Sequence, residues 1–430
     1  MMKTIKAYKT ELKPNNKQAS MLEGCCGYAR FVYNWALAYW IDEYKRGEKR
    51  TGWMKLNTKL TELKQADYKW MYEYPNCIRE YAMRNCDSAY QNFFRNIKSG
   101  RNGKNGKQAG FPKFKKKKSA KQSFTIGNKD VKIESDRIRL GKLGWFRLKE
   151  KDYLPIAPEK IYNATVTKRG NRWYVSVQCD VEMPERKAQG EPVGVDVGIK
   201  SLAATSLGNY YENPKALQKA QEQLVRLNRE LSRRKLGGKN RSKTQKKLAK
   251  LYWRIENIRK DALHKATSDI LAIAKQDTER PRAVIIEDLN VKGMVKNHHI
   301  AQAVSDASFY EFRRQLEYKG NWYGTEVYVI DRFYPSSKTC SNCGAIHQDL
   351  KLSDRIFKCE CGLEIDRDLN AAINILKFYT AKHAGINACR DGKVTDFGQC
   401  PSVKQEAGSG KLVNPVWLQT ELSICGEAGC

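Results

Sequence analysis

Two short segments that each end in a carboxylate constrain the fold of this chain most. In VGVDVG, valines alternate with Gly194, Asp196 and Gly198, so a strand here has one apolar face and one face with an acid between two glycines. In AVIIEDLN, both faces are apolar up to Glu287, which is typical of a buried central strand. The glycines beside Asp196 predict space for a metal ion and a large anionic group. We therefore expect an α/β sheet with acids at the ends of its central strands.

A third acid lies far downstream, where EIDRDLNAAINIL predicts the start of an apolar helix. Asp366 and Asp368 compete for this position, because both are within reach of the apolar side of the helix and Asp366 could simply cap it. Asp288 likewise neighbours Glu287, but on the opposite face of the strand. Taken alone, Asp196 could equally be a cap or a surface residue.

Ribonuclease H-like sheets bring together an Asp on the first strand, an acid at the end of a later central strand and an Asp at the start of a terminal helix. Asp196, Glu287 and one of the two downstream aspartates have this order. Carboxylate oxygens are the ligands that Mg²⁺ prefers, and two such ions can activate water and stabilise the leaving oxygen of a phosphodiester. The set of three predicts a nuclease site that holds two Mg²⁺ ions.

Four cysteines lie between the second and third acids in the pattern Cys-x2-Cys, fifteen residues, Cys-x-Cys. They are Cys340, Cys343, Cys359 and Cys361. Gly344 and Gly362 follow the second cysteine of each pair, as tight turns around a metal-bound sulfur require. The second pair has one spacer residue where two are usual, and the alternative is a coincidental cluster of reduced thiols. We expect one structural Zn²⁺ in a zinc ribbon.

The composition favours a polyanionic partner, because 79 Lys and Arg stand against 47 Asp and Glu, a formal net charge of +32. No run of about 18 apolar residues exists, so nucleic acid is favoured over membrane. The first residues lack the apolar stretch of a secretory signal, so we expect a reducing, cytoplasmic location in which the cysteines are thiols or metal ligands. None of the five histidines neighbours a Ser or Cys in a nucleophile-like setting, which leaves catalysis to carboxylates.

The rest of the chain predicts a strand over 3–13, aromatic-rich helices over 17–97 and a set of strands over 123–181 that forms a small barrel or sheet with the first strand. A helical hairpin with a basic loop, KLGGKNRSK, is expected within 214–277. One helix is expected over 305–316.

The lysine run in FPKFKKKK is either a solvated tail or a phosphate contact. We favour the contact, because aromatic residues bracket the lysines and a strand follows. The candidate nucleic-acid-binding residues are Lys113, Lys115, Lys116, Lys117, Lys118, Ser123, Arg84 and Tyr81.

Several motifs together resemble the TnpB proteins of bacterial insertion sequences, which are relatives of the type V CRISPR effectors. They are GVDVGIKSLA, IIEDLNVKGM, FYPSSKTCSNCG and CGLEIDRDLNAAINIL, joined by GYARFVYNWAL, SAYQNFFR and GFPKFKKKK nearer the N-terminus. The likeness extends from about residue 3 to 380. The one-residue spacer in CEC and the long C-terminal extension depart from the family pattern without touching the acids.

The resemblance implies an RNA-guided DNA endonuclease that binds a guide RNA made from the transposon end. Such a protein recognises a short transposon-adjacent motif in double-stranded DNA, cleaves after guide pairing and acts as a monomer on one RNA. Asp196, Glu287 and Asp368 match the catalytic metal-binding acids, with Asp368 chosen because the family acid precedes x-Asn-Ala. The four cysteines match the zinc ligands. A nuclease-silent RNA-guided DNA-binding regulator and a DNA transposase remain alternatives.

The implied architecture is multidomain α/β, with an RNase H-like (RuvC) nuclease domain, a zinc ribbon, an oligonucleotide-binding-like wedge barrel and a helical recognition lobe. The expected boundaries are 1–16 and 111–190 for the wedge barrel, 17–110 for the recognition lobe, 191–335 and 363–380 for the nuclease domain, 336–362 for the ribbon, and 381–430 for a disordered tail.

Overall fold

The computed structural model describes residues 2–99, 110–117, 122–156, 158–183, 185–350 and 354–390. The chain divides into two compact units, 1–380 and 381–430. Helix α10 (Arg367–Arg390) extends into the second unit. The predicted disorder of the tail is therefore wrong for residues 381–390, and residues 391–430 lie outside the described residues.

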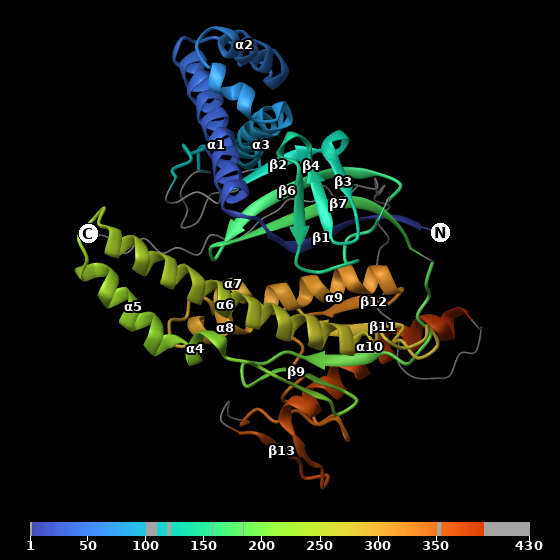
Figure 1. Cartoon of the computed structure of the whole chain (residues 1–430). Helices are drawn as coiled ribbons and strands as arrows, with labels where there is room; N and C mark the ends of the chain where they lie inside the picture. The colour runs from blue at the N-terminus through green and yellow to red at the C-terminus, as the bar shows by residue number, and fades with distance from the viewer. Residues whose placement is uncertain are drawn as a thin grey trace. The chain divides into compact units, whose positions relative to one another are not determined.

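The first helices follow a long strand, as predicted. They are α1 (Asn16–Lys45), α2 (Trp53–Ala66), the 3₁₀ helix η1 (Lys69–Glu73) and α3 (Asn76–Lys98) (Figure 1). A reciprocal capping box begins α1, because the backbone N–H of Gln18 donates to Asn15 Oδ1 at 2.8 Å and the Asn15 N–H donates to Gln18 Oε1 at 3.0 Å.

A seven-stranded sheet has the order β2-β6-β7-β1-β5-β4-β3. Its strands are β1 (Met2–Lys13), β2 (Ser123–Gly127), β3 (Val131–Ile133), β4 (Arg137–Leu140), β5 (Trp145–Leu148), β6 (Ile161–Arg169) and β7 (Arg172–Met183). Short 3₁₀ helices, η3 (Asn128–Asp130) and η4 (Gly141–Leu143), connect some of them. Strand β1 lies between β7 and β5, which confirms that the first strand joins the later set.

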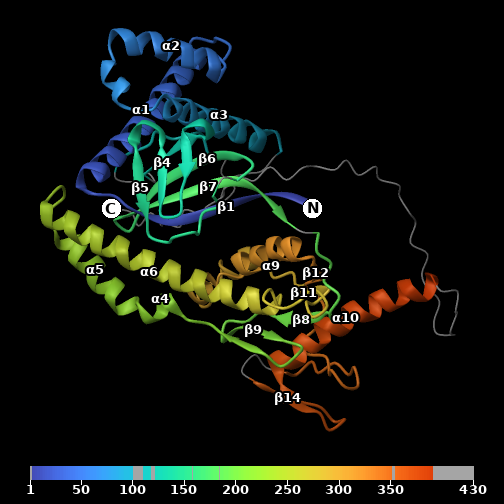
Figure 2. The same ribbon diagram turned by 45° about the vertical axis from the view of Figure 1, so that its right-hand side comes forward.

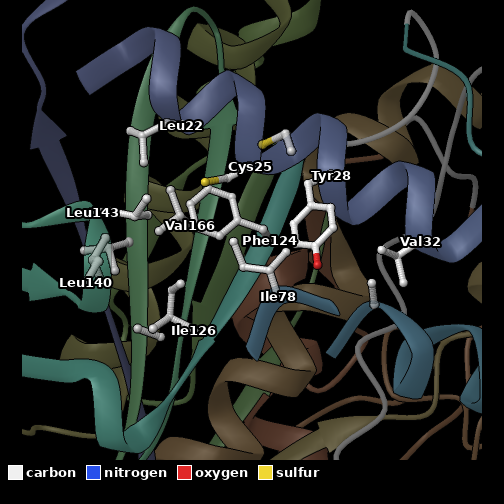
Figure 3. Packing of buried hydrophobic residues seen from close by; sticks show 14 of the residues in the cluster. Leu22, Cys25, Tyr28, Val32, Ile78, Phe124, Ile126, Leu140, Leu143 and Val166 are labelled. Atoms are coloured by element: carbon white, nitrogen blue, oxygen red, sulfur yellow. The ribbon is translucent and has the colours of Figure 1, made fainter. Parts of the chain in front are cut away.

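The first helices and the seven-stranded sheet share one hydrophobic core. Leu22, Cys25 and Tyr28 of α1 pack in the same buried cluster as Phe124 of β2 and Val166 of β6 (Figure 3). Burial of these apolar surfaces is the main stabilising contribution to this part of the chain.

The second half of the described chain contains a five-stranded sheet with the strand order β10-β9-β8-β11-β12. Its strands are β8 (Val193–Asp196), β9 (Ser201–Thr205), β10 (Tyr210–Glu212), β11 (Ala283–Glu287) and β12 (Glu326–Ile330). Strands β8, β11 and β12 are parallel, whereas β9 and β10 are antiparallel to their neighbours. The fold is therefore mixed α/β, with β11 buried at the centre of its parallel part, as predicted.

Gly194 of β8 is needed for close packing of α10. A Cβ atom at this position would lie 2.2 Å from the backbone oxygen of Ala372, which is closer than such contacts can be. The space beside this glycine is filled by α10, so the prediction that Gly194 leaves room for a metal ion and a large anionic group is wrong for this one glycine. The reason is that a glycine in a strand equally marks close approach of another backbone.

Helices α4 (Ala216–Lys219), α5 (Gln221–Arg233) and α6 (Lys239–Ile270) form the predicted hairpin (Figure 2). The connecting loop is shorter than predicted, because α6 already begins at Lys239. The single helix predicted over 305–316 is wrong. Residues Ala301–Ala307 (α8) and Phe309–Tyr323 (α9) are separate helices, because Ser308 has a left-handed φ of 56°.

The remaining elements are α7 (Val291–Met294) and the hairpin of β13 (Ile356–Lys358) with β14 (Glu364–Asp366). Among the described helices, none combines the length and the apolar character that crossing a bilayer requires.

Candidate functional site

Asp196 and Glu287 lie at the carboxyl ends of adjacent parallel strands. Val195 of β8 pairs with Ile286 of β11, so the next residue of each strand is an acid at the same edge of the sheet. Burial, together with the negative charges of Glu287 and Asp368, raises the pKa of Asp196 to about 8. The fold thus brings the three predicted acids into electrostatic contact.

Glu287 is held in place by a serine that the sequence analysis did not single out. The Ser336 hydroxyl donates a hydrogen bond to Glu287 Oε1. Burial raises the pKa of Glu287, and this hydrogen bond acts in the opposite direction by stabilising the charged form. Ser336 lies in the FYPSSKTC motif, and its position shortly after an apolar strand was the available signal.

The structure gives Asp366 and Asp368 different surroundings. Asp366 Oδ1 accepts hydrogen bonds from the backbone N–H groups of Asp368 at 2.9 Å and Leu369 at 3.2 Å, so Asp366 caps α10. Asp368 lies in the first turn, where burial and the neighbouring charge of Asp366 raise its pKa. This arrangement favours Asp368 as the third acid.

Asp288 is engaged elsewhere. Its carboxylate accepts hydrogen bonds from Arg313 at 3.1 Å and from Arg332. These contacts, led by the hydrogen bond from Arg332, lower the pKa of Asp288. The carboxylate next to Glu287 is therefore neutralised by two guanidinium groups.

The chemistry of the three acids fits divalent metal. Their mutual repulsion in a desolvated place disfavours three negative charges, and a hard divalent cation would remove that penalty. The acids are more widely spread than the cysteines. Within the described residues, only the four cysteines form a group of three or more ligands whose atoms all lie within 4.8 Å of one another.

The four cysteine sulfurs form a compact cluster. Cys340 Sγ lies 3.6 Å from Cys361 Sγ, and Cys343 Sγ lies 3.6 Å from Cys359 Sγ. Gly344 and Gly362 have φ values of 81° and 88°, so both knuckle turns form despite the short second spacer. Four sulfurs at these distances fit a tetrahedral Zn²⁺.

The cysteine cluster is tied to the helix that carries Asp368. Asn370 Oδ1 accepts from the Ser341 N–H at 3.0 Å, and Asn370 Nδ2 donates to the Thr339 oxygen at 2.8 Å. Asn374 Nδ2 donates to the Ser336 oxygen at 2.8 Å. Both asparagines are fully buried. The sequence analysis missed these residues, although two asparagines four residues apart in an apolar helix indicate buried polar contacts.

The predicted lysine contacts divide into two groups. Lys113, Lys116 and Lys117 are exposed. Lys115 instead packs inside the lobe, where its Nζ lies 3.8 Å from the centre of the Tyr33 ring and burial lowers its pKa. The predicted phosphate contact of Lys115 does not fit this position, because the path of the chain brings its side chain onto Tyr33. Lys118 lies outside the described residues.

The other predicted nucleic-acid contacts lie near the junction of helices and sheet. Tyr81 and Arg84 are on α3, with the Arg84 guanidinium 4.6 Å from the centre of the Trp53 ring. Ser123 is the first residue of β2 and is half-buried.

Comparison with known proteins gives the family. A "Putative RNA-guided DNA endonuclease" of Streptomyces pristinaespiralis is 33% identical over 91% of this chain and 93% of its own length. "Putative RNA-guided DNA endonuclease InsQ" of Escherichia coli K12 is 32% identical over 94% of this chain and 98% of its own length. A mimivirus "TnpB-like protein L79" is 36% identical over 33% of this chain. The chain belongs to the TnpB family.

Family models cover most of this TnpB chain in pieces. One described as "Probable transposase" matches residues 175–298, and "Cas12f1-like, TNB domain" matches 309–375. A "Helix-turn-helix domain" matches 1–49, which the structure folds as β1 and α1. A cryo-EM structure of a Cas12f1-sgRNA-target DNA complex has a similar fold, with a TM-score of 0.50 and 17% identity over 84% of this chain and 83% of that chain.

The raised pKa of Asp196 predicts a pH-dependent stability in Mg²⁺-free protein. The folded state keeps a proton on Asp196 up to about pH 8, whereas the unfolded chain releases it near the ordinary value of 3.8. Because the folded state binds more protons across this window, the free energy of unfolding should fall as pH rises from about 4 to 8. Asp196→Asn should raise it at pH 8 by about 2 to 5 kcal/mol.

Thermal unfolding of both proteins from pH 5 to 8.5 in Mg²⁺-free buffer measures this effect. Added Mg²⁺ should stabilise the unsubstituted protein at pH 8 and leave Asp196→Asn nearly unchanged. Parallel pH profiles for the two proteins would show that Asp196 is not desolvated by its neighbours.

Proposed function

We propose that this chain is an RNA-guided DNA endonuclease encoded by a transposon. It binds a guide RNA derived from the transposon end, recognises a short adjacent motif in double-stranded DNA and hydrolyses guide-complementary DNA. The observation that carries the proposal is that Asp196 and Glu287 end adjacent parallel strands, where the negative charge of Asp368 at the start of α10 also acts on Asp196. The names of its relatives support it.

The five-stranded sheet has the strand order of RNase H-like nucleases, with three antiparallel strands followed by two parallel ones. We assign residues 191–335 and 363–380 to this nuclease domain and 336–362 to a zinc ribbon. The seven-stranded sheet, 1–16 and 111–190, is assigned as the oligonucleotide-binding-like wedge, and 17–110 as the recognition lobe. We propose that one chain, acting as a monomer on one RNA, carries both the nucleic-acid-binding parts and the three acids.

In the proposed mechanism Asp196, Glu287 and Asp368 would hold two Mg²⁺ ions. When bound, the ions supply activation of the attacking water and stabilisation of the leaving oxygen. Ser336 orients Glu287, and Asp366 fixes the first turn of α10, which sets the position of Asp368. The cysteine cluster fixes the other end of that turn through Asn370.

A nuclease-silent RNA-guided regulator is the first alternative, and it is disfavoured because all three acids are present. A DNA transposase is the second, since similar acids can serve strand transfer. Sequencing of RNA that copurifies with the chain, followed by incubation with a matching DNA duplex and Mg²⁺, separates the three. We expect one abundant RNA with a variable end and hydrolysed DNA. Bound but intact DNA would support the regulator, and joined DNA strands would support the transposase.

The exposed lysines of the run are expected to contact nucleic-acid phosphates. Lys116→Ala with Lys117→Ala should weaken RNA or DNA binding several-fold and reduce the slope of log affinity against log salt by about one to two. Lys115→Ala should instead lower the free energy of unfolding by about 1 kcal/mol, because its ammonium packs on Tyr33.

Binding titrations at several salt concentrations and thermal unfolding measure the two effects separately. If the double variant bound nucleic acid as well as the unsubstituted protein, the lysine run would be a solvated segment without phosphate contacts. Loss of binding by Lys115→Ala without loss of stability would overturn the separation of the two groups.

A further inference from the structure

Two buried cations of the lobe, Arg79 and Lys64, form no ion pair with a carboxylate of the described residues. Arg79 of α3 is 6% exposed, and its Nε and Nη1 atoms have no hydrogen-bond partner. Lys64 of α2 is 4% exposed, and its Nζ donates to Asn76 Oδ1 at 2.9 Å. Buried charges in folded proteins are normally paired, so this arrangement is costly in the free protein.

The charged groups that act on the Lys64 ammonium are positive, like Lys64 itself. After burial, the groups that lower its pKa are Arg79 and Lys142 of η4. Asp130 of η3 accepts a hydrogen bond from the Cys77 thiol. Arg79 and Lys64 therefore form a positively charged cluster in the helices that pack on the seven-stranded sheet.

The start of α3 adds to this positive field. Its N-cap residue is Pro75, no side chain caps it, and no acid lies in its first turn. Asn76, the partner of Lys64, is the first residue of the helix. An uncapped helix start presents N–H groups and the positive end of the helix dipole, which bind phosphate.

Aromatic side chains lie at the rim. The Tyr72 ring covers the Lys64 ammonium, with 3.8 Å between Nζ and the ring centre, and Tyr72 is 51% exposed. Trp70 is 39% exposed and packs edge-on against Tyr28, whose buried hydroxyl also lacks a partner. Exposed aromatic rings next to cations are typical of sites that hold a phosphate and stack its base.

We propose that Arg79, Lys64 and the first turn of α3 bind one backbone phosphate of the bound nucleic acid. Tyr72 swings away from Lys64 when the phosphate enters and stacks on the adjacent base. The proposal rests on the proposed function, because it needs RNA or DNA as the ligand. The shared chemistry is a phosphodiester, which the guide RNA or the target DNA can supply.

Arg79→Met tests the site, because methionine is apolar and of similar length. Removing an unpaired buried cation should leave the free protein equally or more thermostable. The same change should weaken binding of either the guide RNA or the target DNA by about tenfold and reduce its salt slope by about one. Lys64→Met should have the same effects on thermal stability, nucleic-acid affinity and salt slope. Lys55→Met removes an exposed charge from the same helix α2 and is the matched control.

Methylphosphonate substitution of single phosphates, first in the guide RNA and then in the target DNA, identifies the ligand. One position should weaken binding to the unsubstituted protein by about tenfold and have no further effect on Arg79→Met. Equal affinity of Arg79→Met and the unsubstituted protein for both nucleic acids would overturn the site while leaving the nuclease proposal intact. An unsubstituted protein that binds no RNA would overturn both.

Discussion

Asp196→Ala is expected to abolish cleavage of a guide-matched DNA duplex, with a loss of at least about 10³-fold in the single-turnover rate. The same variant should bind guide RNA and target DNA within about twofold of the unsubstituted protein, because Asp196 ends β8 of the five-stranded sheet and is not one of the proposed phosphate contacts on α2 and α3. Single-turnover cleavage with excess protein–RNA complex measures the first quantity, and equilibrium binding at fixed salt measures the second.

The neighbouring acids are the matched controls. Glu287→Gln and Asp368→Asn should lose cleavage like Asp196→Ala. Asp288→Asn should retain it, because that carboxylate is held by two arginines. Asp366→Asn should cost about 1 kcal/mol of stability through a weakened cap and keep most of the activity. If Asp366→Ala abolished cleavage and Asp368→Ala did not, the assignment of the third acid would be wrong.

Loss of zinc is the second large effect. Cys340→Ser combined with Cys361→Ser should reduce bound zinc from one equivalent to none, because these sulfurs form one of the two close pairs. The first knuckle holds Asn370 at the start of α10, so its loss should release the turn that carries Asp368. Cleavage should fall by at least about 100-fold although the acids remain.

Zinc content by mass spectrometry, thermal unfolding and cleavage measure the three consequences. Cys179→Ala changes a buried thiol of the seven-stranded sheet and should retain the zinc. A full equivalent of zinc in the double variant, or none in the unsubstituted protein, would contradict the assignment. Normal cleavage without zinc would show that the ribbon does not support α10.

Much of the site could be predicted because its parts have local signals. Apolar strands that end in an acid predicted Asp196 and Glu287, and the knuckle glycines predicted the cysteine cluster. Sequence periodicity does not separate Asp366 from Asp368, because it does not show which of the two carboxylates caps the helix. The TnpB resemblance favours Asp368, since the family acid precedes x-Asn-Ala, and the capping contact of Asp366 favours the same residue.

Other features depend on tertiary packing and had no local signal. Gly194 lies under the backbone of α10, a segment far away in the sequence. Ser308 breaks a continuous helical pattern with a left-handed residue, which the spacing of apolar residues does not indicate. Lys115 is half-buried, whereas Lys113, Lys116 and Lys117 are exposed, because only the three-dimensional path of the chain brings Lys115 onto Tyr33.

The central claim is that Asp196, Glu287 and Asp368 jointly hold catalytic metal. Anomalous diffraction from crystals of the chain with guide RNA, matched DNA and Mn²⁺ in place of Mg²⁺ tests it most directly. We expect two manganese peaks beside the ends of β8 and β11, both bound by Asp196 and absent in Asp196→Ala. Peaks coordinated by Asp366 or Asp288, or no manganese between the three acids, would contradict the account.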